Sequence, residues 1–324
     1  MNEKNKTRQG SVNLSCGGIA SFCKFPICPN LDDLKSDVAI LGIPWDSGTG
    51  YRPGSRLGPR SVRNYSVRFA FGERGVKKSG YWDITEKRRY LENISFSDCG
   101  DVDVLYLDVE ESFKRITKDV SKILKKKAFP VIIGGDHSVT FPVVRGYKGF
   151  EEDINLIHFD AHPDYNDSVL GVRFASGSPI KRCSELNYIK KILSIGVRGL
   201  RNNEVAYQDA ISRGNMFVSA EDVLFKKETD FISKIPKGNV YVTIDMDVFD
   251  PSIAPGVCSP EAGGLLYYHM KSLLKAIAIK CRVVGMDLVE VNPMVENIGV
   301  TSSLAAQIIL EFLGAIFNEK YRRW

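Results

Sequence analysis

The chain has 324 residues and is 44% hydrophobic, which suffices for the core of one large α/β domain. Its 44 basic and 39 acidic residues give a net charge of +5, and no basic block is longer than Lys125–Lys127, a balance that excludes a nucleic-acid-binding footprint. The polar first ten residues predict no signal peptide, and no apolar run approaches the ~20 residues of a membrane span. Neither a nucleic acid nor a membrane is therefore expected as a partner.

In chain order, residues 1–36 read as an irregular lead-in to a first strand at 37–44. The loop at 45–59 is rich in glycine and proline and is long enough to predict a role at a site or an interface. A helix is expected over 58–69, and residues 70–100 are mixed in character and low in periodicity. Further helices are predicted at 107–127, 267–279 and 301–317. Further strands are predicted at 131–133, 154–159, 192–197, 216–218, 240–244 and 283–287.

Strands that alternate with helices predict a mostly parallel sheet covered on both faces, a three-layer α/β/α fold. No internal repeat or linker is visible, so residues 37–324 are interpreted as a single domain. The seven cysteines lack CxxC spacing and favour a reducing cytoplasm over a disulfide framework. Cys16, Cys23 and Cys28 cluster near the start, but their spacing is loose and a fourth zinc ligand is absent.

Acidic residues and histidines follow three of the predicted strands. The strand at 240–244 ends in Asp245 and Asp247, whose period-2 spacing places both carboxylates on one side. The strand at 154–159 runs into Asp160, His162 and Asp164 with the same alternation. Two such carboxylates at a buried strand end are costly unless something positive lies between them, although an Asp-rich turn remains the alternative for the 240–264 segment alone.

The third strand ends in two glycines followed by Asp136 and His137. His137 completes a set of six candidate ligands, two imidazoles and four carboxylates without thiolate, which favours a hard-to-borderline divalent ion over structural zinc. So many carboxylates suit two ions that share a bridging group. Mn²⁺ is expected first, with Ni²⁺ or Co²⁺ as alternatives. The predicted ligands are His137, Asp160, His162, Asp164, Asp245 and Asp247.

The segments GGDHS, FDAHPD and TIDMDVFDPSIAPG, in this order, resemble the ureohydrolases, the arginase and agmatinase superfamily. Further matches lie at 42–63, 194–199 and 285–293, so that the resemblance covers about residues 37–317. GTGYRPGSRLGP, VRG and PEAGGL favour the agmatinase branch. The resemblance implies an arginase-like fold, two metal ions per chain and a homo-oligomer, a trimer or hexamer.

The implied reaction is hydrolysis of a guanidino compound, in which a metal-held hydroxide attacks the guanidinium carbon and urea is released. The substrate guanidinium is planar and charged, so it requires a carboxylate, and the resemblance places this role on Glu290. Asp160, Glu290 and Ser176 are the predicted catalytic residues. Ser176 stands in FASGSPI, where relatives carry a proton-shuttling histidine.

This departure keeps two alternatives open. Ser-Gly-Ser-Pro resembles the formiminoglutamase branch, which releases formamide, and loss of the histidine fits an impaired metal-binding homologue. Of the remaining histidines, His158 is interpreted as a core residue or a support for the ligands, and His269 as a surface or packing residue.

Three further polar or thiol residues lie close to these motifs in the sequence. Asn166 is either a loop cap or a ligand for a substrate carboxylate, and Ser259 is expected to line the pocket. Cys258 has no histidine partner in the sequence and is interpreted as a buried thiol.

Overall fold

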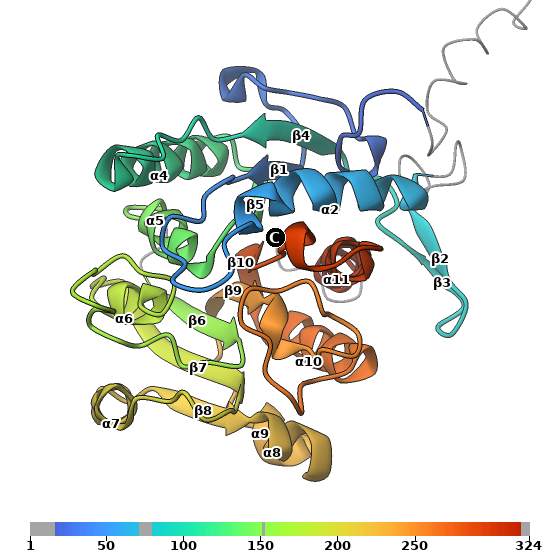
Figure 1. Ribbon diagram of the computed structural model, residues 1–324. Helices are drawn as coiled ribbons and strands as arrows, with labels where there is room; N and C mark the ends of the chain where they lie inside the picture. Colours follow the sequence, from blue (N-terminus) through green and yellow to red (C-terminus); the bar gives the residue numbers. More distant parts are fainter. Residues whose placement is uncertain (1–16, 71–79, 151–152, 319–324) are drawn as a thin grey trace, which may run out of the picture.

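A sheet of eight parallel strands runs through residues 17–70, 80–150 and 153–318, the part of the chain that the computed structural model describes (Figure 1). The predicted three-layer α/β/α architecture is confirmed, and every strand pairing within this sheet is parallel. The strands, in sheet order, are β4 (Phe96–Asp101), β1 (Val38–Gly42), β5 (Phe129–Ile133), β10 (Arg282–Val289), β9 (Asn239–Asp245), β6 (Ile154–Phe159), β7 (Ile189–Val197) and β8 (Met216–Ser219).

Helices cover both faces of the sheet (Figure 1). One layer contains α2 (Gly58–Ser66), α10 (Tyr267–Lys280) and α11 (Val300–Ile316), and the other contains α4 (Val109–Lys125), α5 (Thr140–Arg145) and α6 (Pro179–Ser184). The short helices α7 (Glu204–Ser212), α8 (Ala220–Phe225) and α9 (Glu228–Ile232) lie toward the β8 edge. Alternate strand residues enter opposite cores: Ile157 packs with the α10–α11 layer, and Leu156 packs with the α4–α6 layer. Each element predicted from residue 107 onward is present, with its ends displaced by three residues or fewer.

The four central strands end level with one another, and this register determines where the site lies. Ile133 of β5 is paired with Leu288 of β10, Leu288 with Ile244 of β9, and Ile244 with Phe159 of β6. Side chains one to five residues beyond this row therefore meet above the same carboxyl edge of the sheet. This edge is where open α/β sheets place their ligands.

Residues 80–101 contain structure that the sequence analysis did not predict. They form the hairpin β2 (Tyr81–Asp83) and β3 (Arg88–Tyr90), and edge strand β4. The β4 sequence is polar, and Asp98 is buried in it because Arg63 of α2 forms a two-pronged ion pair with its carboxylate, at 2.9 and 3.0 Å. A partner in a distant helix, and not hydrophobic alternation, stabilises this strand.

The described part of the lead-in packs against this same edge. Phe25 stacks on Phe96 with ring centroids 4.3 Å apart, and the Phe22 backbone N–H donates to Asp98. Cys23 is buried, and burial raises the pKa of its thiol, whereas Cys28 is partly exposed. Cys16 lies outside the described residues. Among the described helices, none combines the length and the apolar character that crossing a bilayer requires.

Candidate metal centre and active site

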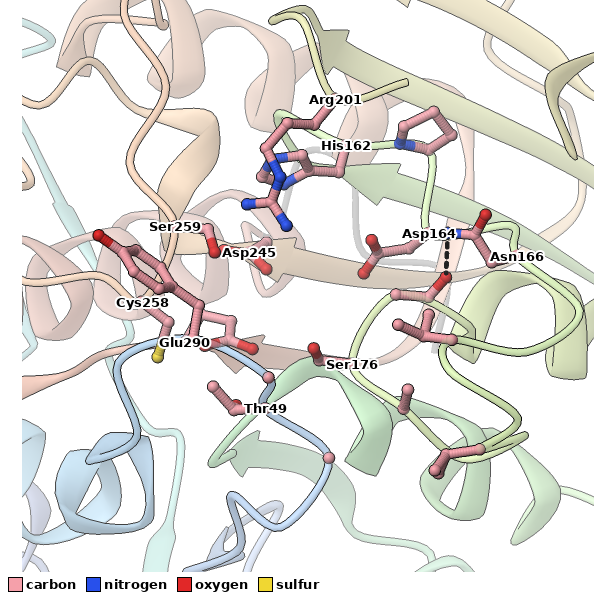
Figure 2. A pocket seen from close by; sticks show the side chains of 18 of the residues that line it. Thr49, His162, Asp164, Asn166, Ser176, Arg201, Asp245, Cys258, Ser259 and Glu290 are labelled. Carbon is pink, nitrogen blue, oxygen red and sulfur yellow. Dashed lines mark hydrogen bonds between the residues drawn. The ribbon is translucent and has the colours of Figure 1, made fainter. Parts of the chain in front are cut away.

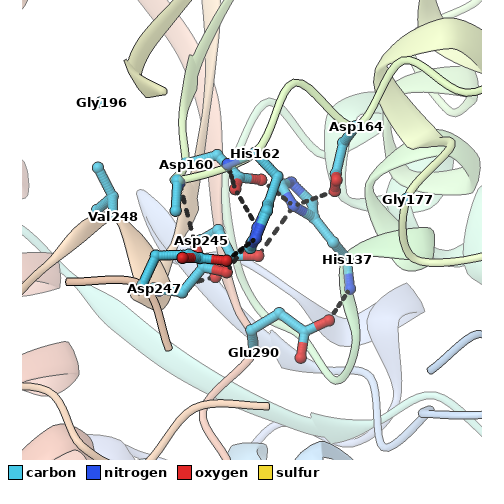
Figure 3. Close-up of polar contacts among 12 residues, drawn as sticks. His137, Asp160, His162, Asp164, Gly177, Gly196, Asp245, Asp247, Val248 and Glu290 are labelled. Atoms are coloured by element: carbon cyan, nitrogen blue, oxygen red, sulfur yellow. Dashed lines mark hydrogen bonds and ion pairs between the residues drawn. The ribbon is translucent and has the colours of Figure 1, made fainter. Parts of the chain in front are cut away.

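Six side chains from three strand ends meet above the central row of the sheet (Figure 3). Asp160 follows β6 directly, Asp245 is the last residue of β9, and His137 begins the short 3-10 turn after β5. Local hydrogen bonds fix these turns: the Asp245 carboxylate accepts the Asp247 backbone N–H at 2.8 Å, and the Asp160 carboxylate accepts that of His162 at 2.5 Å. The structure thus brings together all six predicted ligands.

The six side chains divide into two groups that share Asp160. In one group His137 Nδ1 lies 2.9 Å from Asp160 Oδ2 and 3.1 Å from both Asp164 Oδ2 and Asp245 Oδ2. The second group places His162 Nδ1 3.3 Å from Asp160 Oδ1 and 3.0 Å from Asp247 Oδ2. Asp160 therefore turns one oxygen toward each imidazole and is common to both groups.

The pKa shifts of this cluster reflect an excess of buried carboxylates over cationic side chains. Burial and the neighbouring Asp160 raise the pKa of Asp164 to about 7, and burial with Asp247 raises the pKa of Asp245 well above its usual range. Burial alone would lower the pKa of His137, but its carboxylate partners raise it strongly. Among the described residues, no lysine or arginine forms an ion pair with any of the four carboxylates. The donor set thus fits divalent cations, which would neutralise it.

A layer of hydrogen bonds orients the two imidazoles and the shared carboxylate. His137 Nε2 lies 3.0 Å from Thr243 Oγ1, which leaves Nδ1 to face the carboxylates. His158 is fully buried between Ser194 Oγ at 3.0 Å and Asp160 Oδ2 at 2.8 Å, in agreement with its interpretation as a support residue. Such partners set the tautomer and the ring orientation of a metal-ligating histidine.

Thr243→Val is expected to weaken Mn²⁺ binding by about 10- to 100-fold, because valine keeps the shape but removes the acceptor that orients the His137 ring. Titration calorimetry on the metal-free variant would measure this loss. Thr229→Val, at an exposed threonine of α9, is the control and should bind as the wild type does. An unchanged affinity in Thr243→Val would show that His137 does not depend on this hydrogen bond.

A cavity of about 450 Å³ opens directly above the metal centre (Figure 2). Its volume suits a small-molecule ligand. Asp164, Asp245 and Asp247 form part of its floor, and the predicted residues Asn166, Ser176, Ser259 and Glu290 all line its wall. The cavity therefore unites four of the six predicted metal ligands, His162 among them, with the predicted substrate-binding residues.

Glu290 presents a buried carboxylate to this cavity. It follows β10 with a left-handed backbone, φ 64°, and its Oε1 accepts the His137 backbone N–H at 2.9 Å. Its Oε2 is buried without a hydrogen-bond partner among the described residues. Burial and the nearby Asp136 raise the pKa of Glu290 to about 8. A cationic ligand would offset the buried negative charge of this carboxylate and supply a hydrogen-bond donor to Oε2.

The other predicted residues have distinct surroundings. Asn166 braces the loop: its side-chain N–H donates to Gly177 O at 3.2 Å, and its side-chain oxygen accepts from Asn203 at 2.9 Å. Cys258 is buried, as predicted, and burial raises the pKa of its thiol. His269 accepts the Leu266 backbone N–H and caps α10, away from the cavity.

Sequence reasoning missed Thr243, Thr49 and Arg201. Thr243 lies two residues before Asp245 in the same strand, so period-2 alternation was a usable signal for it. Thr49 and Arg201 line the cavity from irregular loops, where no periodicity indicates which way a side chain points.

The family model of the arginase family matches residues 36–314. Over 92% of its length, the chain is 30% identical to the human mitochondrial guanidino acid hydrolase, of which 83% is covered. It is 33% identical to the agmatinase of Bacillus subtilis, over 86% of this chain and 91% of that protein. The solved structure of proclavaminate amidino hydrolase from Streptomyces clavuligerus superposes with a TM-score of 0.80 at 29% identity and covers 93% of this chain and 98% of that one.

Proposed function

Because the chain belongs to the arginase family and is a hydrolase of C–N bonds in linear amidines, we propose that it cleaves a guanidino compound into urea and an amine, with two divalent ions held above the sheet. Mn²⁺ is the first metal to test, with Ni²⁺ and Co²⁺ next. One observation carries the proposal: two ligand groups that share Asp160 lie in the same cavity as the half-satisfied carboxylate of Glu290.

Each of the two ligand groups described above would hold one ion. His137, Asp164 and Asp245 would hold one ion and His162 with Asp247 the other, with Asp160 common to both. When bound, such a pair of ions lowers the pKa of a shared water and so supplies a nucleophile at neutral pH.

Glu290 binds and orients the guanidinium in this proposal. A planar guanidinium offers parallel N–H donors that match the two oxygens of one carboxylate. The His137 backbone N–H holds Glu290 Oε1 in place, so that Oε2 is presented to the substrate. The guanidinium charge also neutralises a carboxylate that burial otherwise disfavours.

Ser176 lies in the cavity wall, where its backbone N–H donates to Gly48 O at 3.0 Å. Its hydroxyl can donate and accept a hydrogen bond but carries no charge at neutral pH. Among the described residues that line the cavity, His162 is the single histidine, and it belongs to the metal centre. Ser176 is accordingly proposed to orient water or the departing amine, and not to serve as a charged proton carrier.

Product identification tests this function. The protein, reconstituted separately with Mn²⁺, Ni²⁺ and Co²⁺, is incubated with guanidino and formimino compounds, and urea, formamide and ammonia are measured. Urea from a guanidino compound is the expected result. Formamide would favour the formiminoglutamase alternative suggested by Ser176. Two bound metals per chain with no product from any compound would favour the impaired homologue.

A further inference from the structure

Arg201 brings an unneutralised positive charge into the cavity. It lies in the loop between β7 and α7, and Figure 2 shows its guanidinium extending into the cavity that His162 and Ser259 also line. No ion pair or hydrogen bond joins its side chain to any described residue. Among the described residues that line the cavity, it is the single lysine or arginine.

The two asparagines that line the cavity with Arg201 already have hydrogen-bond partners. The Asn203 side-chain oxygen caps α7 by accepting the N–H groups of Val205 and Ala206, and its N–H donates to Asn166. Asn166 in turn donates to Gly177. The two asparagines thus brace the loops around the cavity, and Arg201 remains the charged group that is available to a ligand.

We propose that Arg201 binds a carboxylate at the far end of the substrate, so that the enzyme acts on a guanidino carboxylic acid in preference to a guanidino amine. This inference rests on the proposed function. Two divalent cations would balance the four carboxylates of the metal centre, and Glu290 would balance the substrate guanidinium. Glu261, the carboxylate that lines the outer hollow together with Arg201, lies 3.5 Å from His162 Nε2 and forms no ion pair with Arg201. A substrate carboxylate would give Arg201 an ion-pair partner through the fork geometry that guanidinium groups favour.

A substrate with a distal ammonium group, such as agmatine, would meet the opposite situation. Its ammonium would approach Arg201, a like charge, and every carboxylate that lines the cavity is committed either to the metal centre or to the guanidinium. Like charges brought together in a partly enclosed site repel. The cavity therefore discriminates between the two substrate classes by charge.

The chain offers a matched control for this charge. Arg52 lines an outer hollow together with Tyr51 and Arg201, but it does not line the cavity itself. Its guanidinium lies over the Tyr51 ring, 5.2 Å from the centroid. Removing Arg52 changes the net charge of the entrance by the same amount as removing Arg201 and leaves the proposed contact in place.

The test compares kcat/KM for 4-guanidinobutanoate, agmatine and uncharged butylguanidine in the Mn²⁺-loaded wild type, Arg201→Gln and Arg52→Gln. The wild type should prefer the acid to butylguanidine, and butylguanidine to agmatine. Arg201→Gln should lower the ratio of acid to butylguanidine by about 10- to 100-fold, mainly through KM, as expected for a lost charged hydrogen bond. Arg52→Gln should change this ratio less than threefold, and Arg201→Glu should shift preference toward agmatine.

The other possible outcomes contradict either the Arg201–carboxylate contact or the proposed function. If butylguanidine is hydrolysed but the ratio is the same in Arg201→Gln as in the wild type, the carboxylate contact is wrong and the proposed function stands. If Arg52→Gln lowers the ratio as much as Arg201→Gln does, the preference arises from the general field of the entrance and the contact is again wrong. If the wild type hydrolyses none of the three compounds but releases urea from another guanidino compound, this inference fails and the proposed function stands. If no guanidino compound yields urea, both fail.

Discussion

Asp160→Asn is expected to abolish both metal binding and urea production. One Asp160 oxygen lies toward His137 and the other toward His162, so this residue belongs to both ligand groups. An asparagine offers one oxygen and turns an N–H₂ group toward the second ion, which it cannot bind. A single substitution therefore alters both ligand groups. Activity should fall by more than the ~100-fold that is typical for loss of a residue that only hydrogen-bonds to a metal ligand.

Metal analysis and calorimetry would follow the loss of ions, and urea release would follow the loss of activity. Added Mn²⁺ should raise the melting temperature of the wild type but not that of Asp160→Asn, since a ligand stabilises only the state that binds it. Asp247→Asn alters the His162 group alone and should retain one ion per chain. Asp103→Asn, at an exposed carboxylate, is the neutral control. Two bound ions and a normal rate in Asp160→Asn would refute the shared-ligand assignment.

Glu290→Gln is expected to separate metal binding from turnover. The amide oxygen of glutamine can still accept the His137 backbone N–H, so the turn beneath the metal centre should persist. The variant should therefore bind two ions per chain but lose at least ~100-fold in kcat/KM on guanidino substrates, because a neutral amide does not pair with a guanidinium. Metal titration and urea assays on the same preparation distinguish the two effects.

The stability of Glu290→Gln is a second measurement that does not depend on turnover. The pKa of Glu290 is raised to about 8 in the folded protein, from the usual glutamate value of 4.5. Its ionised form therefore destabilises the ligand-free fold progressively as the pH rises from about 4.5 to 8, and a neutral amide removes this penalty. The metal-free variant should melt no lower than the wild type at pH 8. Turnover that equals the wild-type rate would exclude Glu290 as the guanidinium anchor.

The parts of the site that lie on regular strands could be predicted from the sequence. Asp160 and Asp245 end apolar runs, and period 2 together with a parallel sheet places such residues along one edge. The sequence alone did not give the register that aligns Ile133, Leu288 and Ile244. That register nevertheless decides which side chains meet, because a shift of one residue would reverse the faces of a strand.

What could not be predicted depends on contacts between distant segments. Strand β4 is polar and becomes recognisable only when Arg63 is seen paired with Asp98, 35 residues further along the chain. Asn166 had two interpretations, and the structure supplies the loop-bracing contacts of the first, with Gly177 and Asn203, while the substrate role remains a prediction. Arg201 lies in a loop whose course follows from no local pattern.

The long sequence separations within the site have a consequence for biosynthesis. His137 contacts Thr243, 106 residues later, and its backbone N–H contacts Glu290, 153 residues later. A growing chain on the ribosome lacks Asp245 and Asp247 until β9 has emerged, and Glu290 follows only after β10. Parallel pairing over such distances is also slow to form. The proposed ions can therefore meet the full ligand set only after residues 1–247 of the 324-residue chain have been synthesised, so metal binding would act on a nearly complete sheet and not on the first segments to fold.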